Sequence, residues 1–373
     1  MNAADNSTNR PVSVAIVNYN GLETLDQTIR SVLAQDISPR DIRILDNNST
    51  DGSVEFVKAR FPKIAVTKLP ANRGPNPARN EGLRAALHDH VLVMDNDIVL
   101  APDYISRLMG VHIENPEAGA VTGQIRFHDR PDTIQYNGTY IHYAGEIMLN
   151  RRESADPIKV GCVSAGAVLL DRQKVFRLGG FDEDFFIGWE DGDLTFRLSL
   201  AGFPCYAVSK AVCFHIRRER GRKWVRFQTR NRWWFIGKNY DARTIVLALP
   251  AILLLQLGAG FFFLLKGDFG SFCCGTLDAL RSAPMIMGKR KAVQSLKKIG
   301  DGALLRGERV DLPGGLEKSA PGRFLLAAFS LLFRIYWCLI RVFLKAEGRR
   351  QPSSRHSGAL PSREGGKAEV RKF

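Results

Sequence analysis

The feature that most constrains the fold is a regular alternation of short apolar runs and amphipathic segments. Apolar runs that begin at Val12, Ile42 and Ile64 each end in polar residues, and segments with helical spacing of their apolar side chains follow them. A fourth run, VLVMDNDIVL over residues 91–100, ends the series. Strands and helices that alternate at this spacing predict a parallel sheet with helices on both faces.

The residues that follow these strands are mostly asparagines and aspartates. Asn18, Tyr19 and Asn20 follow the first strand, Asp46 follows the second, and Asp95-Asn96-Asp97 interrupts the fourth. Because ligands of open α/β sheets bind outside the carboxyl ends of the strands, we expect one crevice to collect these side chains. No G-x-G-x-x-G follows the first strand and no Walker-type motif occurs, so the sequence favours a nucleotide site built on carboxylates and a metal.

Asp95 and Asp97 bring two carboxylates to the end of a strand with a buried pattern. Unpaired carboxylates beside an apolar core cost several kcal/mol or take up a proton, so a divalent cation with oxygen ligands is a favourable counter-ion. A solvated turn between two strands is the alternative reading of so short a motif.

Two later segments carry further signals. Residues 160–170, VGCVSAGAVLL, predict a strand whose small residues allow either close approach to the backbone or tight packing against a helix. Residues 179–203 place several acids beside phenylalanines and a tryptophan, and a helix is predicted from Asp193 to Leu200 with Glu190 and Asp191 near its first turn. A carboxylate against a water-poor aromatic wall has a raised pKa, which suits a general base.

A set of motifs in fixed order resembles the inverting family 2 glycosyltransferases, notably rhamnosyltransferase-like bacterial members of envelope polysaccharide pathways. The motifs, which cover about residues 12–235, are VNYNG (17–21), DNNSTDGS (46–53), NRGPNPARNEG (72–82), MDNDI (94–98), SAGA (164–167) and GGFDEDFFIGWEDGDLTFRL (179–198), followed by His215. The resemblance implies a GT-A fold, which is a Rossmann-like mixed α/β sheet with helices on both faces.

The resemblance also implies roles for individual residues. Those expected to bind a nucleotide-diphosphate sugar are Asn18, Tyr19, Asn20, Asp46, Asn72, Arg79 and Asp95. Asp97 is expected to bind Mg²⁺ or Mn²⁺, with His215 as a further metal ligand, a phosphate contact or a structural residue. Asp191 of the Glu190–Asp191 pair is the expected catalytic base. Pro75 and Pro77 depart from the small or glycine-rich residues usual in the family's third loop.

A basic, aromatic stretch precedes a long apolar run. The formal charge of the chain is +15, and residues 217–243 hold ten Lys or Arg against two acids, interleaved with tryptophans and phenylalanines. Such a patch is also typical of single-stranded nucleic-acid binding. Residues 244–265 carry no charge over 22 positions, long enough to cross a bilayer core. We therefore expect an anionic membrane surface, and no nucleic acid, as the partner.

The remaining C-terminal region predicts further membrane association. Residues 324–344 are apolar except for Arg334 and Arg341, which favours an amphipathic helix in the membrane plane. The intervening residues 266–323 hold eleven Lys or Arg against six acids, against the positive-inside tendency if 244–265 crossed fully. Pro250 and two glycines in that run make a re-entrant hairpin the alternative.

These observations predict a domain plan and a location. Residues 1–11 are expected to be disordered, 12–240 to form the GT-A domain, 241–347 to form membrane-associated helices and 348–373 to be a disordered basic tail. The N-terminus has no basic segment followed by an apolar run, and the cysteines show no C-x-x-C spacing. Both features favour a catalytic domain on the cytoplasmic face of the plasma (inner) membrane.

The expected function is inverting transfer of one sugar, rhamnose-like or another hexose, to a lipid-linked or saccharide acceptor in envelope polysaccharide synthesis. Two alternatives remain. One is a processive polysaccharide synthase, although QTRNRW (228–233) has its arginine and tryptophan one residue beyond the Q-x-x-R-W spacing of such enzymes. The other is a non-catalytic protein that binds a nucleotide sugar or nucleic acid.

Overall fold

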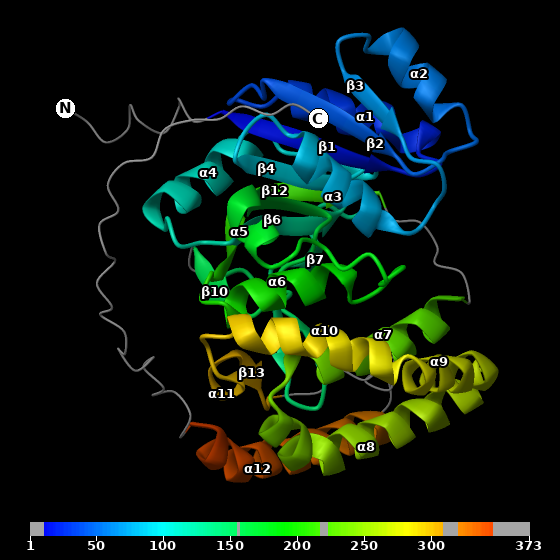
Figure 1. The fold of residues 1–373 in the computed structure, drawn as a ribbon, viewed down its shortest axis with the longest axis vertical. Helices are drawn as coiled ribbons and strands as arrows, with labels where there is room; N and C mark the ends of the chain where they lie inside the picture. Colours follow the sequence, from blue (N-terminus) through cyan, green and yellow to red (C-terminus); the bar gives the residue numbers. More distant parts are fainter. Residues whose placement is uncertain (1–10, 155–156, 217–222, 309–319, 346–373) are drawn as a thin grey trace, which may run out of the picture.

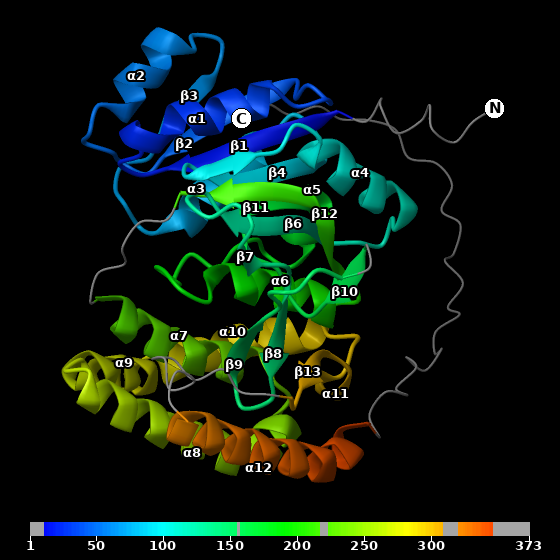
Figure 2. The ribbon, with the colours of Figure 1, turned by 180° about the vertical axis from the view of Figure 1, so that it is seen from behind.

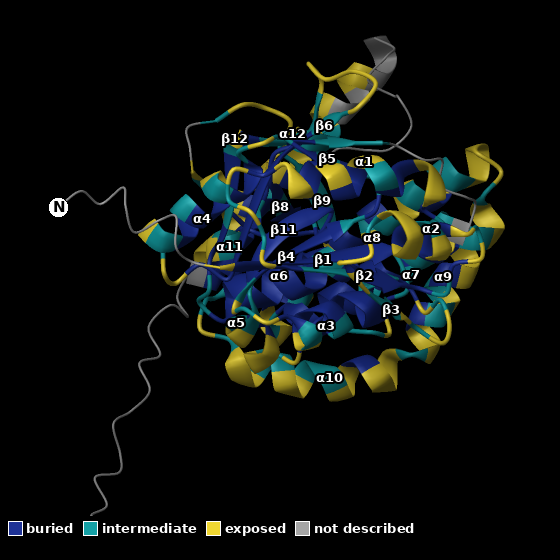
Figure 3. Cartoon of the chain, turned by 90° about the horizontal axis from the view of Figure 1, so that it is seen from above, coloured by how far each residue is buried: buried dark blue, intermediate teal, exposed yellow. Residues whose placement is uncertain are grey.

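A mixed sheet forms the centre of the upper part of the molecule (Figure 1). The computed structural model describes residues 11–154, 157–216, 223–308 and 320–345. The main strands lie in the order β10-β12-β6-β11-β4-β1-β2-β3. Viewed from above, these strands are largely buried, with exposed residues concentrated on the surrounding helices and loops (Figure 3).

One half of the sheet is parallel, as predicted. It contains β1 (Val12–Asn18), β2 (Asp41–Asp46), β3 (Ala65–Lys68) and β4 (His90–Asp95). The helices between them are α1 (Leu22–Leu33), α2 (Ser53–Arg60) and α3 (Pro75–Ala85). In the register of the sheet Asn18 lies beside Asp46, and Val17 lies beside Asp95. The polar ends of these strands therefore meet at one edge.

The other half brings in antiparallel neighbours. Its elements are β5 (Ile98–Leu100), α4 (Tyr104–Glu114), β6 (Ala120–Phe127), β7 (Ile134–Tyr136), β10 (Ile158–Val160), β11 (Ala167–Asp171) and β12 (Cys205–His215). β11 is antiparallel to both β4 and β6, whereas β12 is parallel to β6. The sequence predicts a single strand over 160–170, and this prediction is wrong in extent. β10 ends at residue 160 and β11 begins at residue 167, and residues 161–166 belong to neither strand.

A second, three-stranded sheet lies below the first (Figure 2), and two further helices lie between β11 and β12 in the sequence. The strands are β8 (Thr139–His142), β9 (Glu146–Leu149) and β13 (Leu305–Arg306), in the order β13-β8-β9. The helices are α5 (Arg172–Arg177) and α6 (Glu190–Leu200), and α6 begins three residues earlier than its sequence predicts. β13 joins the sheet from a distant part of the chain, so the C-terminal region is built into this layer.

The remaining helices form the base of the molecule. They are α7 (Lys223–Asn239), α8 (Ala242–Leu265), α9 (Phe269–Arg281), α10 (Ala283–Leu296), α11 (Asp301–Leu304) and α12 (Ala320–Lys345). Opposite views show α8 and α12 side by side across the base (Figures 1 and 2). The Tyr336 hydroxyl of α12 donates to the Leu247 carbonyl of α8 at 2.7 Å. The re-entrant alternative is wrong for α8, which runs unbroken through Pro250.

α8 is apolar on both of its faces. Thr244, Ala248, Ile252 and Leu255 form a buried stripe at helical spacing against the rest of the protein. The opposite face of α8, and much of α9 and α12, is apolar but exposed: Val246, Leu249, Leu253, Leu257, Phe261, Leu264, Phe269, Leu277, Leu280, Leu331, Leu332, Ile335, Leu339, Val342 and Phe343. By length and composition, α8 and residues 327–344 of α12 are candidate membrane spans among the described residues. We call the exposed apolar residues of α8, α9 and α12 named above the apolar base.

A buried ionic network joins α6 to the base. The fully buried Asp193 of α6 accepts hydrogen bonds from Arg197 at 3.0 Å, from Lys238 at 2.8 Å and from Asn239 at 3.0 Å. Lys238 of α7 also donates to Asp182 at 2.7 Å, and Lys289 of α10 contacts the same carboxylate. Burial alone would raise the pKa of Asp182, but Lys238 and Lys289 lower it well below its ordinary value.

Candidate active site

Arg79 brings the two acidic segments of the sequence together. This arginine lies in α3 with its side chain almost fully buried. Its Nη2 is 3.2 Å from Asp95 Oδ1 at the end of β4, and its Nη1 is 3.7 Å from Glu190 Oε1 at the start of α6. The acids of the fourth strand and those near residue 190 therefore share one site, with a single guanidinium between them.

The charges at this site are not balanced by Arg79 alone. Burial and the neighbouring Asp191 raise the pKa of Glu190 to about 7, although Arg79 lowers it. Desolvation raises the pKa of Asp95 to about 6, with Arg79 again opposing the shift and Asp97 adding to it. Glu190 Oε2 is buried and has no hydrogen-bond partner among the described residues. The site carries an excess of negative charge that a bound cation would relieve.

Asp97 and His215 form a second pair beside the first. β5 and β12 are paired so that Ile98 lies opposite His215, which places the histidine next to Asp97. His215 Nε2 is 3.4 Å from Asp97 Oδ2, and Nδ1 is 3.0 Å from the side-chain oxygen of Gln135 in β7. With Gln135 accepting from Nδ1–H, the lone pair of Nε2 is free to face Asp97.

This pair fits a divalent cation that keeps other ligands. Within the described ranges, no three His, Cys, Asp or Glu side chains converge as a complete metal cage. Mg²⁺ and Mn²⁺ at phosphate sites commonly take one or two protein ligands and fill the other positions with water and phosphate oxygens. Asp97 and His215 supply an oxygen and a nitrogen of the required kind, with Asp95 nearby.

Asp191 lies in the first turn of α6. Its Oδ2 accepts from the backbone N–H of Ala165 at 3.1 Å, and its Oδ1 accepts from Gly192 N–H at 2.7 Å. Residues 161–166 leave the sheet at this point, and their small side chains let the carboxylate reach the backbone. Both readings of these small residues are observed together, because the side chains that approach the backbone, Asp191, Thr195 and Ser199, belong to the helix α6 packed against it. The carboxylate is half-buried and keeps acceptor capacity.

The backbone around the site includes unusual conformations. Among described residues other than glycine, positive φ occurs at Asn20, Asn48 and Trp189. Asn20 and Asn48 follow β1 and β2, and Trp189 immediately precedes Glu190. Each such residue costs roughly 1–3 kcal/mol and persists where the surroundings fix it, commonly at functional sites. Trp189 is fixed by packing on Phe235 of α7, with ring centroids 4.8 Å apart.

The residues predicted after β1 and β2 differ in accessibility. Asn18 and Asp46 are fully buried, and Asn18 Nδ2 donates to Asp46 Oδ1 at 2.8 Å. Asn18 Oδ1 accepts from Asn96 Nδ2 at 2.7 Å, which ties this pair to the D-x-D segment. Tyr19 is 46% exposed beside them. In this arrangement Tyr19 offers surface to a ligand, while Asn18 and Asp46 hold the loops in shape.

The two prolines of the third loop are accommodated at the start of a helix. Pro75 and Pro77 lie in the first turn of α3, where a proline lacks no needed N–H. Asn72 Oδ1 accepts from Gly74 N–H at 3.0 Å, and Gly74 has φ +87°. A Cβ on Gly74 would lie 2.1 Å from the Phe186 carbonyl oxygen, so only glycine lets this loop approach the acid-rich segment.

Sequence reasoning missed several residues that shape the site. Asn76 and Asn80 of α3 donate to the backbone carbonyls of Asp182 and Phe181 at 2.8 and 2.9 Å. The Tyr136 hydroxyl accepts from Ser164 N–H at 2.8 Å. Gln135 supports His215 across 80 residues of sequence. The asparagines lie within a recognised motif, whereas Gln135 and Tyr136 carry no local signal.

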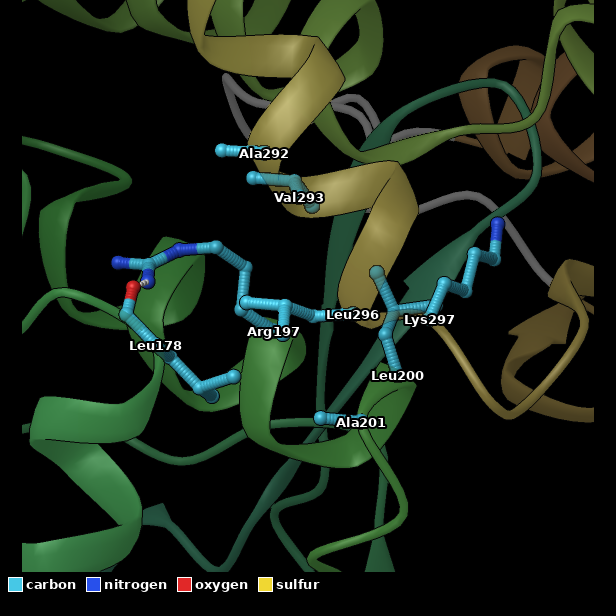
Figure 4. A pocket seen from close by; sticks show the side chains of 8 residues that line it. All are labelled: Leu178, Arg197, Leu200, Ala201, Ala292, Val293, Leu296 and Lys297. Atoms are coloured by element: carbon cyan, nitrogen blue, oxygen red, sulfur yellow. Dashed lines mark hydrogen bonds between the residues drawn. The ribbon is translucent and has the colours of Figure 1, made fainter. Parts of the chain in front are cut away.

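A small cavity elsewhere is not a substrate site. It measures about 40 Å³ and lies between α6 and α10, lined by Leu178, Arg197, Leu200, Ala201, Ala292, Val293, Leu296 and Lys297 (Figure 4). Arg197 donates to the Leu178 carbonyl at its edge at 2.8 Å. This volume suits a water molecule, not a sugar. It marks where α10 packs against the back of α6.

Sequence comparison relates the first part of the chain to known proteins. Residues 13–176 match the model of the family described as Glycosyl transferase family 2, a match that includes Asp95 and Asp97 but ends before Glu190. The poly-beta-1,6-N-acetyl-D-glucosamine synthase of Staphylococcus epidermidis is 27% identical over 206 residues, 54% of this chain and 49% of that protein. The Staphylococcus aureus (strain COL) enzyme of the same name is 28% identical over 199 residues, 52% of this chain and 47% of that protein. The match thus spans about half the length of these relatives.

Comparison with solved structures concerns the fold. The mannosyltransferase PcManGT from Pyrobaculum calidifontis, in complex with GDP-Man and Mn²⁺, superposes with a TM-score of 0.50 at 18% identity, covering 90% of this chain and 88% of that one. GalNAc-T7 with UDP, GalNAc and Mn²⁺ gives a TM-score of 0.52 at 18% identity, covering 62% of this chain and 48% of that one. Both resemble this chain in the arrangement of their elements.

Proposed function

From the premise that this chain carries a glycosyl transferase family 2 domain on a GT-A fold, we propose that it transfers one sugar from a nucleotide-diphosphate donor to a hydroxyl group. The acceptor is lipid-linked or a saccharide, and the reaction inverts the anomeric centre. The observation that supports this proposal is the contact of Arg79 with both Asp95 and Glu190. It supports a site in which Asp95 lies on the donor side and the segment of Glu190 lies on the acceptor side.

The proposed chemistry is a single displacement. Asp191 takes the proton from the acceptor hydroxyl, whose oxygen forms a bond to the anomeric carbon of the sugar. The bond between that carbon and the diphosphate oxygen breaks, and the nucleoside diphosphate leaves with its electron pair. Mg²⁺ or Mn²⁺ on Asp97 and His215, when bound, supplies positive charge for the departing diphosphate.

Glu190 and Arg79 have supporting roles in this proposal. Since its pKa is raised to about 7, Glu190 is partly protonated near neutral pH and adds less negative charge beside Asp191 than an ordinary glutamate would. Arg79 neutralises Asp95 and positions it. Tyr19, Asn20 and Asn72 line the donor loops, and Asn18 and Asp46 fix their shape.

The apolar base supports association with a membrane in the same proposal. An exposed apolar surface of this extent is unfavourable in water. Because α8 packs one face against the protein and lies alongside α12, we infer that both helices lie in the membrane plane. Basic residues in α7 and α10 favour an anionic leaflet, and the plasma membrane with the catalytic domain on its cytoplasmic face is the proposed location.

A processive polysaccharide synthase is the second candidate. It is favoured by the name of the Staphylococcus relatives, although this chain matches only half of their length. Two candidate membrane helices among the described residues offer little material for a polymer channel. Product length separates the two functions, since a synthase extends its product repeatedly and a single-sugar transferase stops after one addition.

The deciding experiment measures donor turnover by the full-length protein in lipid nanodiscs. A panel of nucleotide-diphosphate sugars is supplied with Mn²⁺, with Mg²⁺ or with EDTA, and released nucleotide and product mass are recorded. We expect turnover of one donor class, dependence on the metal, and a product one sugar larger. If the Asp97→Ala and Asp191→Asn proteins turn over the donor as fast as the parent protein does, the proposal that the chain is an enzyme is refuted.

A further inference from the structure

An arginine-lined depression lies away from the catalytic carboxylates. It has a volume of about 340 Å³ and opens between α7 and the junction of α9 with α10. Its lining residues are Arg226, Arg230, Trp234, Asp278, Arg281 and Ser282, and we call them the arginine pocket. The proposed sugar transfer uses none of these side chains.

Arg230 is the central residue of the arginine pocket. Its guanidinium lies 4.0 Å from the centre of the Trp234 ring and 5.0 Å from that of Phe227. Its Nε donates to Asn231 Oδ1 at 2.8 Å. Its Nη2 is buried and has no hydrogen-bond partner in the part of the chain that the structure describes. A buried N–H donor without an acceptor is costly. The residue as a whole is only half-buried, so an oxygen-bearing ligand in the depression can still reach its guanidinium.

The arginine pocket has a net positive charge. Arg226 is held by Asp278 through two bonds of 2.6 and 3.1 Å, and Arg281 adds a third guanidinium. Ser282 Oγ accepts from Trp234 Nε1 at 2.7 Å, which fixes the ring under Arg230. Planar guanidinium groups held in this way match the oxygens of a phosphate group better than mobile lysines do.

The position of the arginine pocket relates it to both the site and the membrane. Trp234 packs edge-on against Phe185 at 5.4 Å, and Phe227 packs against Phe186 at 5.1 Å. These phenylalanines belong to the segment that leads into Glu190. On the other side, Leu277 and Leu280 of α9 are exposed parts of the apolar base. The pocket thus lies between the catalytic segment and the surface proposed to meet lipid.

We propose that the arginine pocket binds the phosphate or diphosphate head of a lipid-linked acceptor. This inference rests on the proposed function and narrows its acceptor to a lipid phosphate. The lipid chain stays in the bilayer beside the apolar base. Arg230 and its neighbours hold the charged head, and the hydroxyl to be glycosylated extends past Phe185 and Phe186 toward Asp191.

The first test measures binding, without any need for turnover. Full-length protein is mixed with phosphatidylcholine vesicles that contain either farnesyl diphosphate or phosphatidylglycerol at matched surface charge, and bound protein is separated by flotation. The parent protein should prefer the farnesyl diphosphate vesicles. Arg230→Gln should weaken that binding roughly tenfold or more, because a charge-assisted contact is lost. Binding to phosphatidylglycerol should change little.

Two further variants keep the test sharp if Arg230→Gln folds poorly. Asp278→Asn removes the one carboxylate among the described residues that line the arginine pocket, and it should tighten binding to the diphosphate vesicles. Arg30→Gln is the matched control, since Arg30, like Arg230, lies over an aromatic ring, here Phe61, but belongs to α1 at the far end of the molecule (Figure 1). It should bind as the parent does.

The outcomes separate the two proposals. Unchanged diphosphate binding by Arg230→Gln and Asp278→Asn would overturn the arginine pocket as an acceptor site. An equal loss on phosphatidylglycerol vesicles would also overturn it, because the pocket would then serve bulk anionic lipid. Where transfer is measurable, Arg230→Gln should raise the KM for the lipid acceptor and leave the KM for the donor unchanged. If no donor is turned over, the proposed function is refuted. The vesicle-binding test of the arginine pocket does not depend on turnover and would still be decisive for lipid binding.

Discussion

Asp191 is the residue on which sugar transfer should depend most. Its carboxylate is positioned by two backbone N–H groups, and within the described ranges it forms no ion pair. Replacing Asp191 by Asn keeps its size and should lower kcat by roughly 10² to 10⁴, the usual effect of losing a general base. The measurement is product formation at saturating donor, with thermal unfolding to verify the fold. Asp26→Asn, an exposed change on α1, should retain full activity.

Gln135 should control metal affinity through His215. Gln135→Ala frees the imidazole to rotate or change tautomer, and such losses typically weaken a metal site by about 10- to 100-fold. Mn²⁺ affinity measured by electron paramagnetic resonance of the free ion checks this without any substrate. Gln135→Glu keeps an acceptor for Nδ1–H and should bind Mn²⁺ at least as well as the parent. Identical affinity in all three proteins would exclude a positioning role.

The residues of the site were predictable to different degrees. Asp95, Asp97 and the Glu190–Asp191 pair were found because acidic motifs end or follow apolar segments, and the structure brings Asp95 and Glu190 together at Arg79. The roles assigned to individual site residues stay predictions. Gln135 could not be found, because its partner His215 becomes its neighbour only when β7 and β12 both pair with β6.

At the scale of elements, α6 and α7 are held together by charge. Removing one member of a buried pair leaves the other uncompensated, so Lys238→Met should reduce the free energy of unfolding by about 3–5 kcal/mol. The pKa of Asp182 and that of Asp193 are lowered in the folded protein, despite burial, by Lys238 and its neighbours. Their contribution is therefore present above the ordinary aspartate pKa and is lost as the pH falls.

Urea unfolding at two pH values tests this assignment. The difference between the parent and Lys238→Met should be large at pH 7 and should be smaller at about pH 3. At that pH, below the ordinary aspartate pKa, the unfolded chain binds protons that the lowered pKa values of Asp182 and Asp193 keep off the folded parent. Lys58→Met on α2 provides an exposed control. A difference that does not depend on pH would mean that Lys238 contributes by packing and not by charge.

Elements with a clear period were the predictable part of the fold. The parallel strands and α1 to α3 follow from alternating apolar patterns. Residues 161–166 were misread, because an apolar run of small residues does not show where the chain leaves the ladder to meet Asp191. The start of α6 was set three residues late, since the conformation of Trp189 depends on packing against α7.

For the whole molecule, the apolar base should determine where the protein resides. A double change, Leu257→Asp with Leu339→Asp, puts charge on exposed positions of α8 and α12 and should abolish flotation with anionic vesicles. Leu87→Asp, at an exposed leucine outside the base, should float as the parent does. Retained flotation of the double variant would exclude this surface as the membrane contact.

The sequence identified the apolar segments but not their orientation. Composition alone allows 244–265 to span, re-enter or lie flat. The unbroken α8 argues against re-entry, and its buried stripe is the observation behind the proposal that it lies flat. If both helices lie in the plane, cysteines placed at Asp241 and Asp268 should both react with an impermeant maleimide added to one side of sealed vesicles. The exposed Cys273, Cys274 and Cys338 are first replaced by serine so that only the introduced thiols are labelled. Protection of one of them would indicate a span.

The pairing of β13 with β8 has a practical consequence for anyone who wants to work without detergent. Leu305 and Arg306 complete a sheet of the catalytic half, although both lie beyond the boundary expected after residue 240. Shortening the gene to its first 240 codons would strip away an edge strand together with the helices. A detergent-free form would instead need polar substitutions at individual exposed apolar side chains, with the C-terminal residues retained.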